Sequence, residues 1–458
     1  MKFERIKPLS DTFNEECGVF GIFSDEEQVL AKNVYLGLYA LQHRGQDSGG
    51  IAVACGEKIV FHKSTGLIQE VFAHGELDGL PQGNIALGHV RYGASGKIMN
   101  AQPLVFTGKC GMTAVASNGV LINDGALRKN LIDENVVFQT SLNTEIIAYL
   151  VNKYSGGDIV KGVLAAAPEL LGAFSFAVMT NDKLVAVRDP HGVRPFALGK
   201  ISGGYVISSE SCGLDAAGAD FIRDIEPGEV LVISREGLAS YELPGKGPGS
   251  CIFEYVYLAR SDSVIDGCSV YEARKESGRI LAKKYPVQAD IVSGVPDSAV
   301  PSARGFSEVS GIPYVEALEK NRYVGRSFIQ HGQNMRENTV SIKMNVLRAN
   351  VKGKRVILVD DSIVRGTTSK KIVEILKQAG AREVHLRISS PPVKHTCPLG
   401  IDIKNEEMLI GARKTESEIN EWLGSDSLRF LTEEDLLETV KTAKNGFCTG
   451  CFNGKYPY

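Results

Sequence analysis

The stretch VILVDDSIVRGTTSKK, at residues 356–371, decides the fold of the second half of the chain. Its first four residues are apolar, which predicts a buried strand, and they run directly into Asp360 and Asp361. A helix is expected to begin just after Gly366. Because ligands of open α/β sheets bind beyond the carboxyl ends of the strands, this strand, turn and helix predict a ligand site.

The chemistry of this turn favours a phosphate as the ligand. Gly366 allows the backbone to approach closely, and the hydroxyls of Thr367 and Thr368 add donors near the helix N-terminus. The carboxylates of Asp360 and Asp361 suit sugar hydroxyls or, through water, Mg²⁺. The alternative, which a bare pair of aspartates would suggest, is an ordinary strand–turn–helix with solvated acids.

Neighbouring segments extend the same architecture. The runs at 289–295 and 383–389 predict further buried strands, and the segments 270–286 and 369–380 predict helices. A helix between two such strands forms a βαβ unit, so this half of the chain should contain a parallel sheet.

The first half has a different pattern, with short strands separated by turns. Helices are predicted over 31–45 and around 145–151, and the Gly/Pro-rich stretch 243–251 is the predicted linker. Strands are predicted at 17–23, 174–179, 184–188, 205–209 and 229–233. The expected organisation is a segment 1–16, domains at 17–250 and 251–440, and a tail at 441–458.

Composition excludes several classes of protein. The chain has 458 residues, of which 43% are hydrophobic and 23% charged, so it is not largely disordered. Its 51 Lys and Arg against 54 Asp and Glu give a net charge of -3, which disfavours nucleic acid as a partner. We expect no membrane span and no secretory signal, and the odd count of 9 cysteines favours a reducing compartment, the cytoplasm.

Cys17 follows a polar segment of sixteen residues and begins a predicted strand. If residues 1–16 are removed as a propeptide, Cys17 carries a free α-amine with a reference pKa of about 7.7–8.0. That amine can accept the thiol proton, so that one residue supplies both nucleophile and base. The alternative is a cysteine that packs as a small hydrophobic side chain.

The string 356–369 resembles the 5-phosphoribosyl-1-pyrophosphate (PRPP) fingerprint of type I phosphoribosyltransferases. The turn GVPDS (294–298) and the basic segment KNRYVGRSFIQ (320–330) fit that resemblance, although alone the basic segment suggests a solvated face. The resemblance implies Mg²⁺ near Ser298, Asp360 and Asp361. It implies PRPP binding by Asp360, Asp361, Ser362, Arg365, Gly366, Thr367, Thr368, Ser369, Lys320, Arg322 and Arg326.

The first half resembles the glutaminase domain of class II amidotransferases, which are N-terminal nucleophile hydrolases with an αββα sandwich fold. The strings that carry the resemblance are CGVFGIF (17–23), LQHRGQDSGGIA (41–52), HVRYG (89–93) and SNG (117–119). The resemblance implies that Cys17 attacks the glutamine amide and that Arg91 holds the substrate carboxylate. The Asn118 side chain and the Gly119 N–H would form the oxyanion hole, and residue 143 would lie at the α-amino group.

Together, the two halves resemble the glutamine PRPP amidotransferase family, in its iron–sulfur-containing branch with an N-terminal propeptide. Further strings, RDPHGVRPFALG (188–199) and EYVYLARSDS (254–263), support this. The resemblance implies an enzyme that makes 5-phosphoribosylamine, glutamate and pyrophosphate from glutamine, PRPP and water. It also implies inhibition by purine nucleotides and a homo-oligomer, either a tetramer or a dimer.

Four cysteines form a candidate metal site. Cys448 and Cys451 make a CxxC pair, whereas Cys251 and Cys397 lie far away in sequence. Four thiolates suit either zinc or an iron–sulfur cluster, and their spacing does not separate the two. The resemblance implies a [4Fe-4S] cluster.

Some positions depart from the family pattern, mostly in the glutaminase half. Asn143 stands where the family has Asp, and Ser117 where it has His; Gly93 and Ala94 lack two hydroxyls, and Glu319 adds an acid beside Lys320. Loss of the charge at residue 143 should weaken binding of an ammonium group by roughly 1.5–3 kcal/mol. The alternative hypothesis is therefore a paralogue with a weakened glutaminase, acting as an ammonia-dependent transferase or a PRPP-binding regulator.

Overall fold

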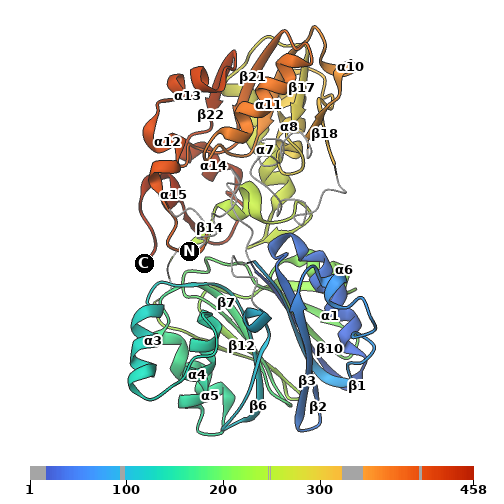
Figure 1. The fold of residues 1–458 in the computed structure, drawn as a ribbon, viewed down its shortest axis with the longest axis vertical. Helices are drawn as coiled ribbons and strands as arrows, with labels where there is room; N and C mark the ends of the chain where they lie inside the picture. The colour runs from blue at the N-terminus through green and yellow to red at the C-terminus, as the bar shows by residue number, and fades with distance from the viewer. Residues whose placement is uncertain (1–16, 93–97, 246, 248, 322–343, 402–404) are drawn as a thin grey trace, which may run out of the picture.

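The computed structural model describes the whole chain except residues 1–16, 93–97, 246, 248, 322–343 and 402–404. Two domains lie one above the other along the long axis of the molecule (Figure 1). The lower domain contains two antiparallel sheets, and the upper domain contains a parallel sheet. The predicted propeptide lies outside the described residues.

The first sheet of the lower domain has seven strands in the order β11-β9-β10-β1-β4-β2-β3. The second has six strands in the order β13-β12-β8-β7-β6-β5. The strands of the first sheet are β1 (Gly18–Gln28), β2 (Ser48–Cys55), β3 (Lys58–Thr65), β4 (Gly83–Arg91), β9 (Ala197–Ile201), β10 (Gly204–Ser208) and β11 (Asp220–Asp224). Those of the second are β5 (Leu104–Gly108), β6 (Gly111–Leu121), β7 (Gly172–Met179), β8 (Leu184–Arg188), β12 (Glu229–Ser234) and β13 (Gly237–Glu242).

The side chains of β1 point to alternate faces of its sheet, which explains why the two sheets and the helices stack in layers. Val19 and Phe23 pack into the core between the two sheets, whereas Phe20 and Ile22 pack against α1 (Leu30–Ala40) on the outside. Both faces of β1 are buried over its first six residues, which is why GVFGIF (18–23) contains no polar side chain. The outer layers are α1, α2 (Ile68–Val71) and α6 (Ser211–Ala216) on the first sheet, and α3 (Asp124–Asp133), α4 (Asn143–Ser155) and α5 (Ile159–Ala166) on the second. The predicted αββα sandwich is confirmed.

One predicted boundary differs from the structure. The helix expected over 31–45 ends at Ala40, and Gln42–Arg44 form a short 3-10 turn, η1. This turn directs His43 and Arg44 toward Glu210, to which both side chains bond. A tertiary charge contact therefore replaces the last turn of helix.

The upper domain has four parallel strands in the order β17-β20-β21-β22. They are β17 (Ile291–Gly294), β20 (Arg355–Asp360), β21 (Glu383–Ile388) and β22 (Ser427–Phe430). Helix α11 (Thr367–Gln378) connects β20 to β21, so the predicted βαβ unit and parallel sheet are confirmed. Helices α7 (Val270–Lys284) and α8 (Val300–Ser310) pack on the opposite face of the sheet from α11.

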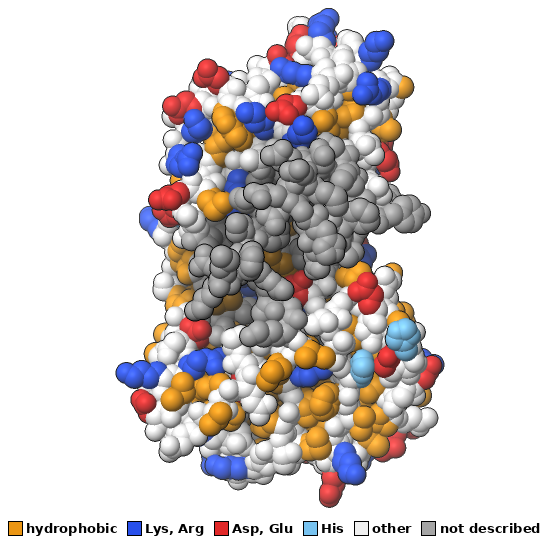
Figure 2. Space-filling model, viewed as in Figure 1, with side chains coloured by type: hydrophobic (Ala, Val, Ile, Leu, Met, Phe, Trp, Pro, Cys, Tyr) orange, Lys and Arg blue, Asp and Glu red, His pale blue; other side chains and the backbone are white. Residues whose placement is uncertain are grey.

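Smaller elements complete the described structure. They are η2 (Ile98–Asn100), η3 (Ala167–Glu169), β14 (Ser250–Cys251), η4 (Glu254–Leu258), β15 (Val264–Ile265), β16 (Cys268–Ser269), β18 (Leu318–Lys320), β19 (Met344–Val346), α10 (Arg348–Val351), η7 (Glu406–Met408), α12 (Ile410–Arg413), α13 (Glu416–Leu423), α14 (Glu433–Thr439), β23 (Phe447–Cys448) and α15 (Gly450–Asn453). In the described part of the chain, no helix has the length and apolar character needed to cross a membrane. On the face seen in Figure 2, basic and acidic side chains are interspersed.

Candidate active sites

The acid pair lies at the carboxyl end of β20, as predicted for a ligand site of a parallel sheet. Asp360 and Asp361 are both 8% exposed, and the Asp361 N–H donates to Asp360 Oδ1 at 2.9 Å. Ser298 donates to Asp361, and the Ser362 hydroxyl donates to Asp361 Oδ1 at 2.5 Å. The structure thus brings together three positions expected around Mg²⁺.

Electrostatics in this acid pair favour a cation. Burial raises the pKa of Asp360 well above its ordinary value, and the neighbouring Asp361 raises it further. Burial also raises the pKa of Asp361, although the hydroxyls of Ser298 and Ser362 oppose the rise. Two buried carboxylates side by side resist ionisation, and a divalent cation would remove that penalty.

The following turn forms a cradle at the N-terminus of α11. Gly366 has φ +83°, and a Cβ there would lie 2.7 Å from the Trp422 ring, so this position requires glycine. The Nη1 atom of Arg365 is buried without a hydrogen-bond partner among the described residues. A guanidinium nitrogen that is buried without a partner beside the first turn of a helix is suited to an anionic group.

The basic segment is described only at its start. Lys320 ends β18 and forms an ion pair with Asp297 in the turn that also contains Ser298. Arg322 and Arg326 lie outside the described residues. The expected binding of PRPP by Arg322 and Arg326 therefore stays a prediction.

In the lower domain, Cys17 is the first described residue and precedes β1. Its thiol donates to the Tyr92 carbonyl at 3.8 Å, and its own carbonyl accepts a bond from Arg44 Nε at 3.4 Å. Arg91 ends β4, the neighbour of β1, so the predicted nucleophile and the predicted carboxylate-binding residue lie at the same edge of this sheet.

Asn118 and Gly119 lie on β6, in the opposite sheet, and β6 contacts β1. Asn118 is 1% exposed, yet neither its amide oxygen nor its amide nitrogen has a partner in the described part of the chain. Gly119 has φ +127°, and a Cβ there would lie 2.0 Å from the Ala173 carbonyl oxygen. A buried amide without a partner, beside an obligatory glycine, has the features of an oxyanion hole.

Ser117 belongs to a network that the sequence did not reveal. Its hydroxyl lies 2.6 Å from the Thr144 hydroxyl, which donates to Gln102 Oε1 at 3.0 Å. The Ser117 carbonyl accepts a bond from His89 Nε2 at 3.0 Å. Burial lowers the pKa of His89 to about 3, so this imidazole is neutral and connects the two sheets as a hydrogen-bond donor. The HVRYG string contains this histidine, but only the fold shows its partner.

Asn143 lies next to a carboxylate that the sequence analysis missed. Its Oδ1 accepts the Leu121 N–H at 3.2 Å, and its Nδ2 donates to Asp124 Oδ2 at 3.4 Å. The start of α4 therefore meets the start of α3 at the end of the strand that bears Asn118. Asp124 is an exposed carboxylate next to the position where the predicted charge is missing.

The four cysteines gather in one apolar region between the domains. Cys251 pairs with Cys448 through the parallel strands β14 and β23, and all four belong to or pack against the same core cluster. Burial raises the pKa of Cys251, Cys448 and Cys451, and the neighbouring thiols add to each increase. No group of three or more His, Cys, Asp or Glu side chains in the described ranges has the arrangement of a metal site. The donor set suits a metal–sulfur centre, whose identity stays a proposal.

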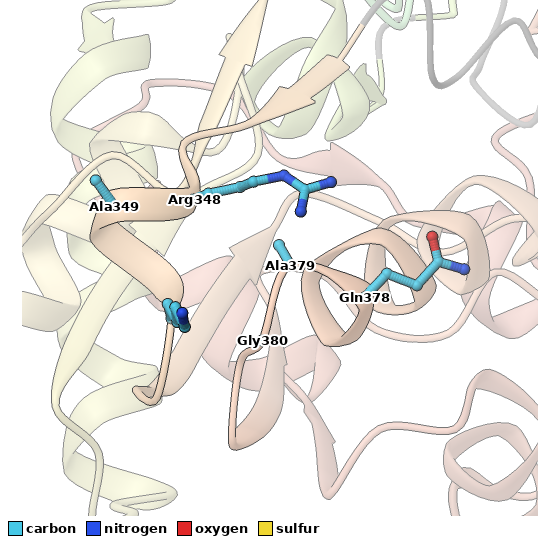
Figure 3. Close-up of a pocket in the computed structure, with 6 residues that line it drawn as sticks. Arg348, Ala349, Gln378, Ala379 and Gly380 are labelled. Carbon is cyan, nitrogen blue, oxygen red and sulfur yellow. The ribbon is translucent and has the colours of Figure 1, made fainter.

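A surface hollow lies away from these sites. It is lined by Arg348, Ala349, Lys352, Gln378, Ala379 and Gly380, which come from α10 and the end of α11 (Figure 3). These residues precede β20 or lie at the end of α11 and just after it, so the hollow lies at the amino end of the sheet, opposite the acid pair. Its cations lie near a helix C-terminus, which their charge stabilises.

Comparison with known proteins identifies both halves. A family model described as a glutamine amidotransferase domain matches residues 89–216, and one described as a phosphoribosyl transferase domain matches residues 270–389. The amidophosphoribosyltransferase of Synechococcus elongatus is 47% identical over 98% of this chain and 92% of that protein. Its Bacillus subtilis counterpart is 46% identical over 97% of this chain and 94% of that protein.

Solved structures agree with the sequence relatives. The glutamine PRPP amidotransferase of Bacillus subtilis, in complex with ADP and GMP, superposes with a TM-score of 0.90 at 44% identity. That comparison covers 96% of this chain and 97% of the other. The chain therefore belongs to the amidophosphoribosyltransferase family.

Proposed function

We propose that this protein hydrolyses glutamine in its lower domain and transfers the ammonia to PRPP in its upper domain. The products are 5-phosphoribosylamine, glutamate and pyrophosphate, the first step of de novo purine synthesis. The observation that carries the proposal is the buried side-chain amide of Asn118, which has no partner among the described residues. It occurs in a chain whose other domain has two buried acids, Asp360 and Asp361, at the end of the parallel strand β20.

The glutaminase step uses residues of both sheets. After removal of residues 1–16, the α-amine of Cys17 takes the thiol proton and the sulfur attacks the side-chain amide of glutamine. The Asn118 amide and the Gly119 N–H stabilise the oxyanion as it forms. Ammonia leaves, and water resolves the thioester to give glutamate. Arg91 holds the substrate carboxylate, with Asn143 and Asp124 near the α-ammonium group.

The transfer step uses the cradle in the upper domain. The N-terminus of α11 and the hydroxyls of Thr367, Thr368 and Ser369 bind the 5-phosphate of PRPP. Ser362, Arg365 and Gly366 complete the loop, while Lys320, Arg322 and Arg326 bind pyrophosphate. Ser298, Asp360 and Asp361 would hold Mg²⁺, which neutralises charge on the leaving pyrophosphate. Ammonia then attacks the anomeric carbon.

Two further parts of the proposal concern cofactor and regulation. Cys251, Cys397, Cys448 and Cys451 would hold a [4Fe-4S] cluster that ties the C-terminal tail to the domain junction. A relative was solved with ADP and GMP, so we include inhibition by purine nucleotides. Assembly into a homo-oligomer completes the proposal.

The decisive experiment is PRPP consumption by anaerobically purified protein, with glutamine and with ammonium chloride in parallel. Comparable turnover with both donors supports the full activity. Turnover with ammonia alone would indicate a decayed glutaminase or an unprocessed Cys17, and the intact mass separates these two. If neither donor supports PRPP consumption, the PRPP-binding regulator becomes the leading hypothesis.

The Asn143 substitution gives a separate test of the weakened-glutaminase hypothesis. If the pocket lacks a charge, Asn143→Asp should lower the KM for glutamine. The expected gain in binding free energy is that of a hydrogen bond to a charged group, about 1.5–3 kcal/mol. An unchanged or higher KM would count against that hypothesis. Asp124, 3.4 Å away, would then be the partner of the substrate ammonium, and Asp124→Asn should raise the KM.

A further inference from the structure

Buried side chains from three separate elements fix the strand beside Asn118, the predicted oxyanion residue. The Asn118 amide has no partner in the described part of the chain, so its direction depends on the strand that carries it. Ser117, the residue before it, is bonded at its N–H, its hydroxyl and its carbonyl. The partners come from β4, from the segment before β5 and from α4, so β6 is held at this point from three directions.

Gln102 is the centre of this arrangement. Its Oε1 accepts the Ser117 N–H at 2.9 Å, and because a backbone N–H can only donate, the oxygen end of the amide must face β6. The same oxygen accepts the Thr144 hydroxyl at 3.0 Å. Thr144 has one hydroxyl proton, so Ser117 is the donor in the 2.6 Å contact between the two hydroxyls. The direction of all three bonds is therefore fixed.

The segment that carries Gln102 is itself tied down. Lys63 of β3 donates to the carbonyls of Ala101 and Pro103 at 2.8 and 3.1 Å, on either side of Gln102. Strand β5 pairs with β6 only from Leu104 onward, so the side chain of Gln102 supplies the acceptor that β6 would otherwise find in a continued strand. The acceptor for β6 is thus set by a clamped backbone.

Thr144 connects the same network to the end of a helix. It lies in the first turn of α4, directly after Asn143, the position predicted to lie at the α-amino group of glutamine. Both Thr144 and Gln102 are buried, so water does not compete for their bonds. The residue before Asn118 is thereby fastened to the helix end that bears the predicted glutamine-binding residue.

We propose that Gln102 and Thr144 are positioning residues of the glutaminase, which hold Ser117 and through it orient the Asn118 amide toward the oxyanion. This inference rests on the proposed function and deepens it. The unbonded amide is free to donate to the transition state, while the bonds of its neighbour restrict how far it can move. Catalysis by an oxyanion hole depends on such preorganisation, because the donor then needs no rearrangement during the reaction.

The test measures kcat and KM for glutamine hydrolysis, and ammonia-dependent PRPP consumption, with protein whose intact mass shows Cys17 at the N-terminus. Thr144→Val keeps the shape of the side chain and removes both of its hydrogen bonds. We expect kcat to fall at least about fivefold, the rate equivalent of one ordinary neutral hydrogen bond, with KM and ammonia-dependent turnover changed less than about twofold. Thr144→Ser, which keeps the hydroxyl, should restore kcat. A raised KM with unchanged kcat would overturn the proposal, because the network would then serve glutamine binding.

A double-mutant cycle with Asn118→Ala shows whether the effect passes through the amide. Once the amide is removed, a positioning residue has nothing left to position. Thr144→Val should therefore lower kcat by less than about twofold in the Asn118→Ala background. If the two losses multiply instead, Thr144 acts independently of the oxyanion donor, and the proposal is overturned.

Ser155→Ala is the matched control. Ser155 lies at the other end of α4, is fully buried, and donates its hydroxyl to the Asn152 carbonyl at 3.0 Å. This variant also loses a buried hydroxyl bond on α4, but it leaves the network around Ser117 intact, so its kcat should change less than about twofold. If it loses as much activity as Thr144→Val, the cause is a general loosening of α4, and the proposal is overturned.

Other outcomes are equally decisive. If Thr144→Val does not fold, Ser117→Ala carries the test because it removes the bond between the two hydroxyls from the other side, and a normal kcat there overturns the proposal. If Asn118→Ala lowers glutaminase activity but Thr144→Val does not, the proposed function stands and this inference falls. If the unaltered protein consumes PRPP with ammonia but hydrolyses no glutamine, the glutaminase part of the proposed function and this inference both fall.

Discussion

Asn118→Ala should disable glutamine hydrolysis while sparing the transferase. The Asn118 amide is buried, with no partner among the described residues that would compete for its N–H. Its donor is therefore fully available to the developing oxyanion, in surroundings of low dielectric constant. Removal of one such donor typically lowers kcat about 10²–10³-fold, equivalent to about 2.7–4 kcal/mol. The KM for glutamine should change far less, because the bond strengthens mainly in the transition state.

The same substitution should also cost little stability, although it removes a buried side chain. A buried amide without a partner costs roughly 1–3 kcal/mol of folding free energy, so its removal offsets the packing lost with the side chain. The melting temperature of Asn118→Ala should therefore be no lower than that of Ser175→Ala. Ser175 is a suitable control because it lies directly opposite Asn118 on β7, and its buried hydroxyl also has no partner among the described residues.

The assay is glutamate release and ammonia-dependent PRPP consumption measured on one preparation of each variant. The reasoning is refuted if kcat for glutamine falls less than about tenfold, which is well below the cost of a lost oxyanion donor. It is also refuted if ammonia-dependent turnover falls in parallel, or if Ser175→Ala loses glutaminase activity equally.

Three further predictions follow from the structure. Gly366→Ala should raise the KM for PRPP with either nitrogen donor, because the backbone φ of +83° and the Trp422 ring 2.7 Å away exclude a Cβ. Gly353→Ala is the control: this glycine also has a positive φ, +72°, but lies in open space, so its substitution should leave the KM for PRPP unchanged. In the folded protein the pKa of His89 is about 3, below its ordinary value of 6.5. As the pH falls, the unfolded chain therefore binds a proton at this histidine before the folded chain does, and the stability of the fold decreases from about pH 6.5 toward pH 3. Between pH 7 and 5 this amounts to about 2 kcal/mol, and the pH dependence of urea midpoints should be flatter in His89→Gln. Cys448→Ser should abolish the iron bound by anaerobically purified protein, whereas Cys268→Ser should not. The proposed [4Fe-4S] cluster is contradicted if the unaltered protein contains zinc instead of iron, or no metal.

Local sequence was sufficient for features that depend on neighbours along the chain. The apolar run before Asp360 and the glycine after Arg365 both lie within 356–371, so strand, turn and helix were predictable from periodicity and turn chemistry. Five strands of the lower domain, namely β1, β7, β8, β10 and β12, were predicted for the same reason. The end of α1 was not, because the contact that replaces the last turn is to Glu210, 167 residues beyond His43.

Features that depend on tertiary pairing were invisible in the sequence. Asp124 and Asn143 are separated by 19 residues, and only the packing of α3 against α4 brings them together. Arg44 and Glu254 are 210 residues apart, on opposite sides of the linker. His89 and Ser117 lie in different sheets. No periodicity or spacing rule links such residues, so the sequence named the reacting groups but not the groups that hold them.

The pattern of satisfied and unsatisfied polar groups favours a working glutaminase over a decayed one. Ser117 replaces a histidine, yet its hydroxyl, its N–H and its carbonyl all have partners within 3.0 Å, in Thr144, Gln102 and His89. The side-chain amide of Asn118, the next residue, has none in the described chain. If Ser117 had merely replaced a lost catalytic side chain, its own buried polar atoms would be expected to lack partners, at a cost in stability. Here the substituted position is fully bonded, and the unbonded amide lies where an oxyanion would form. The substitutions therefore indicate a pocket rebuilt around the same reaction, which is why we expect glutamine to support turnover.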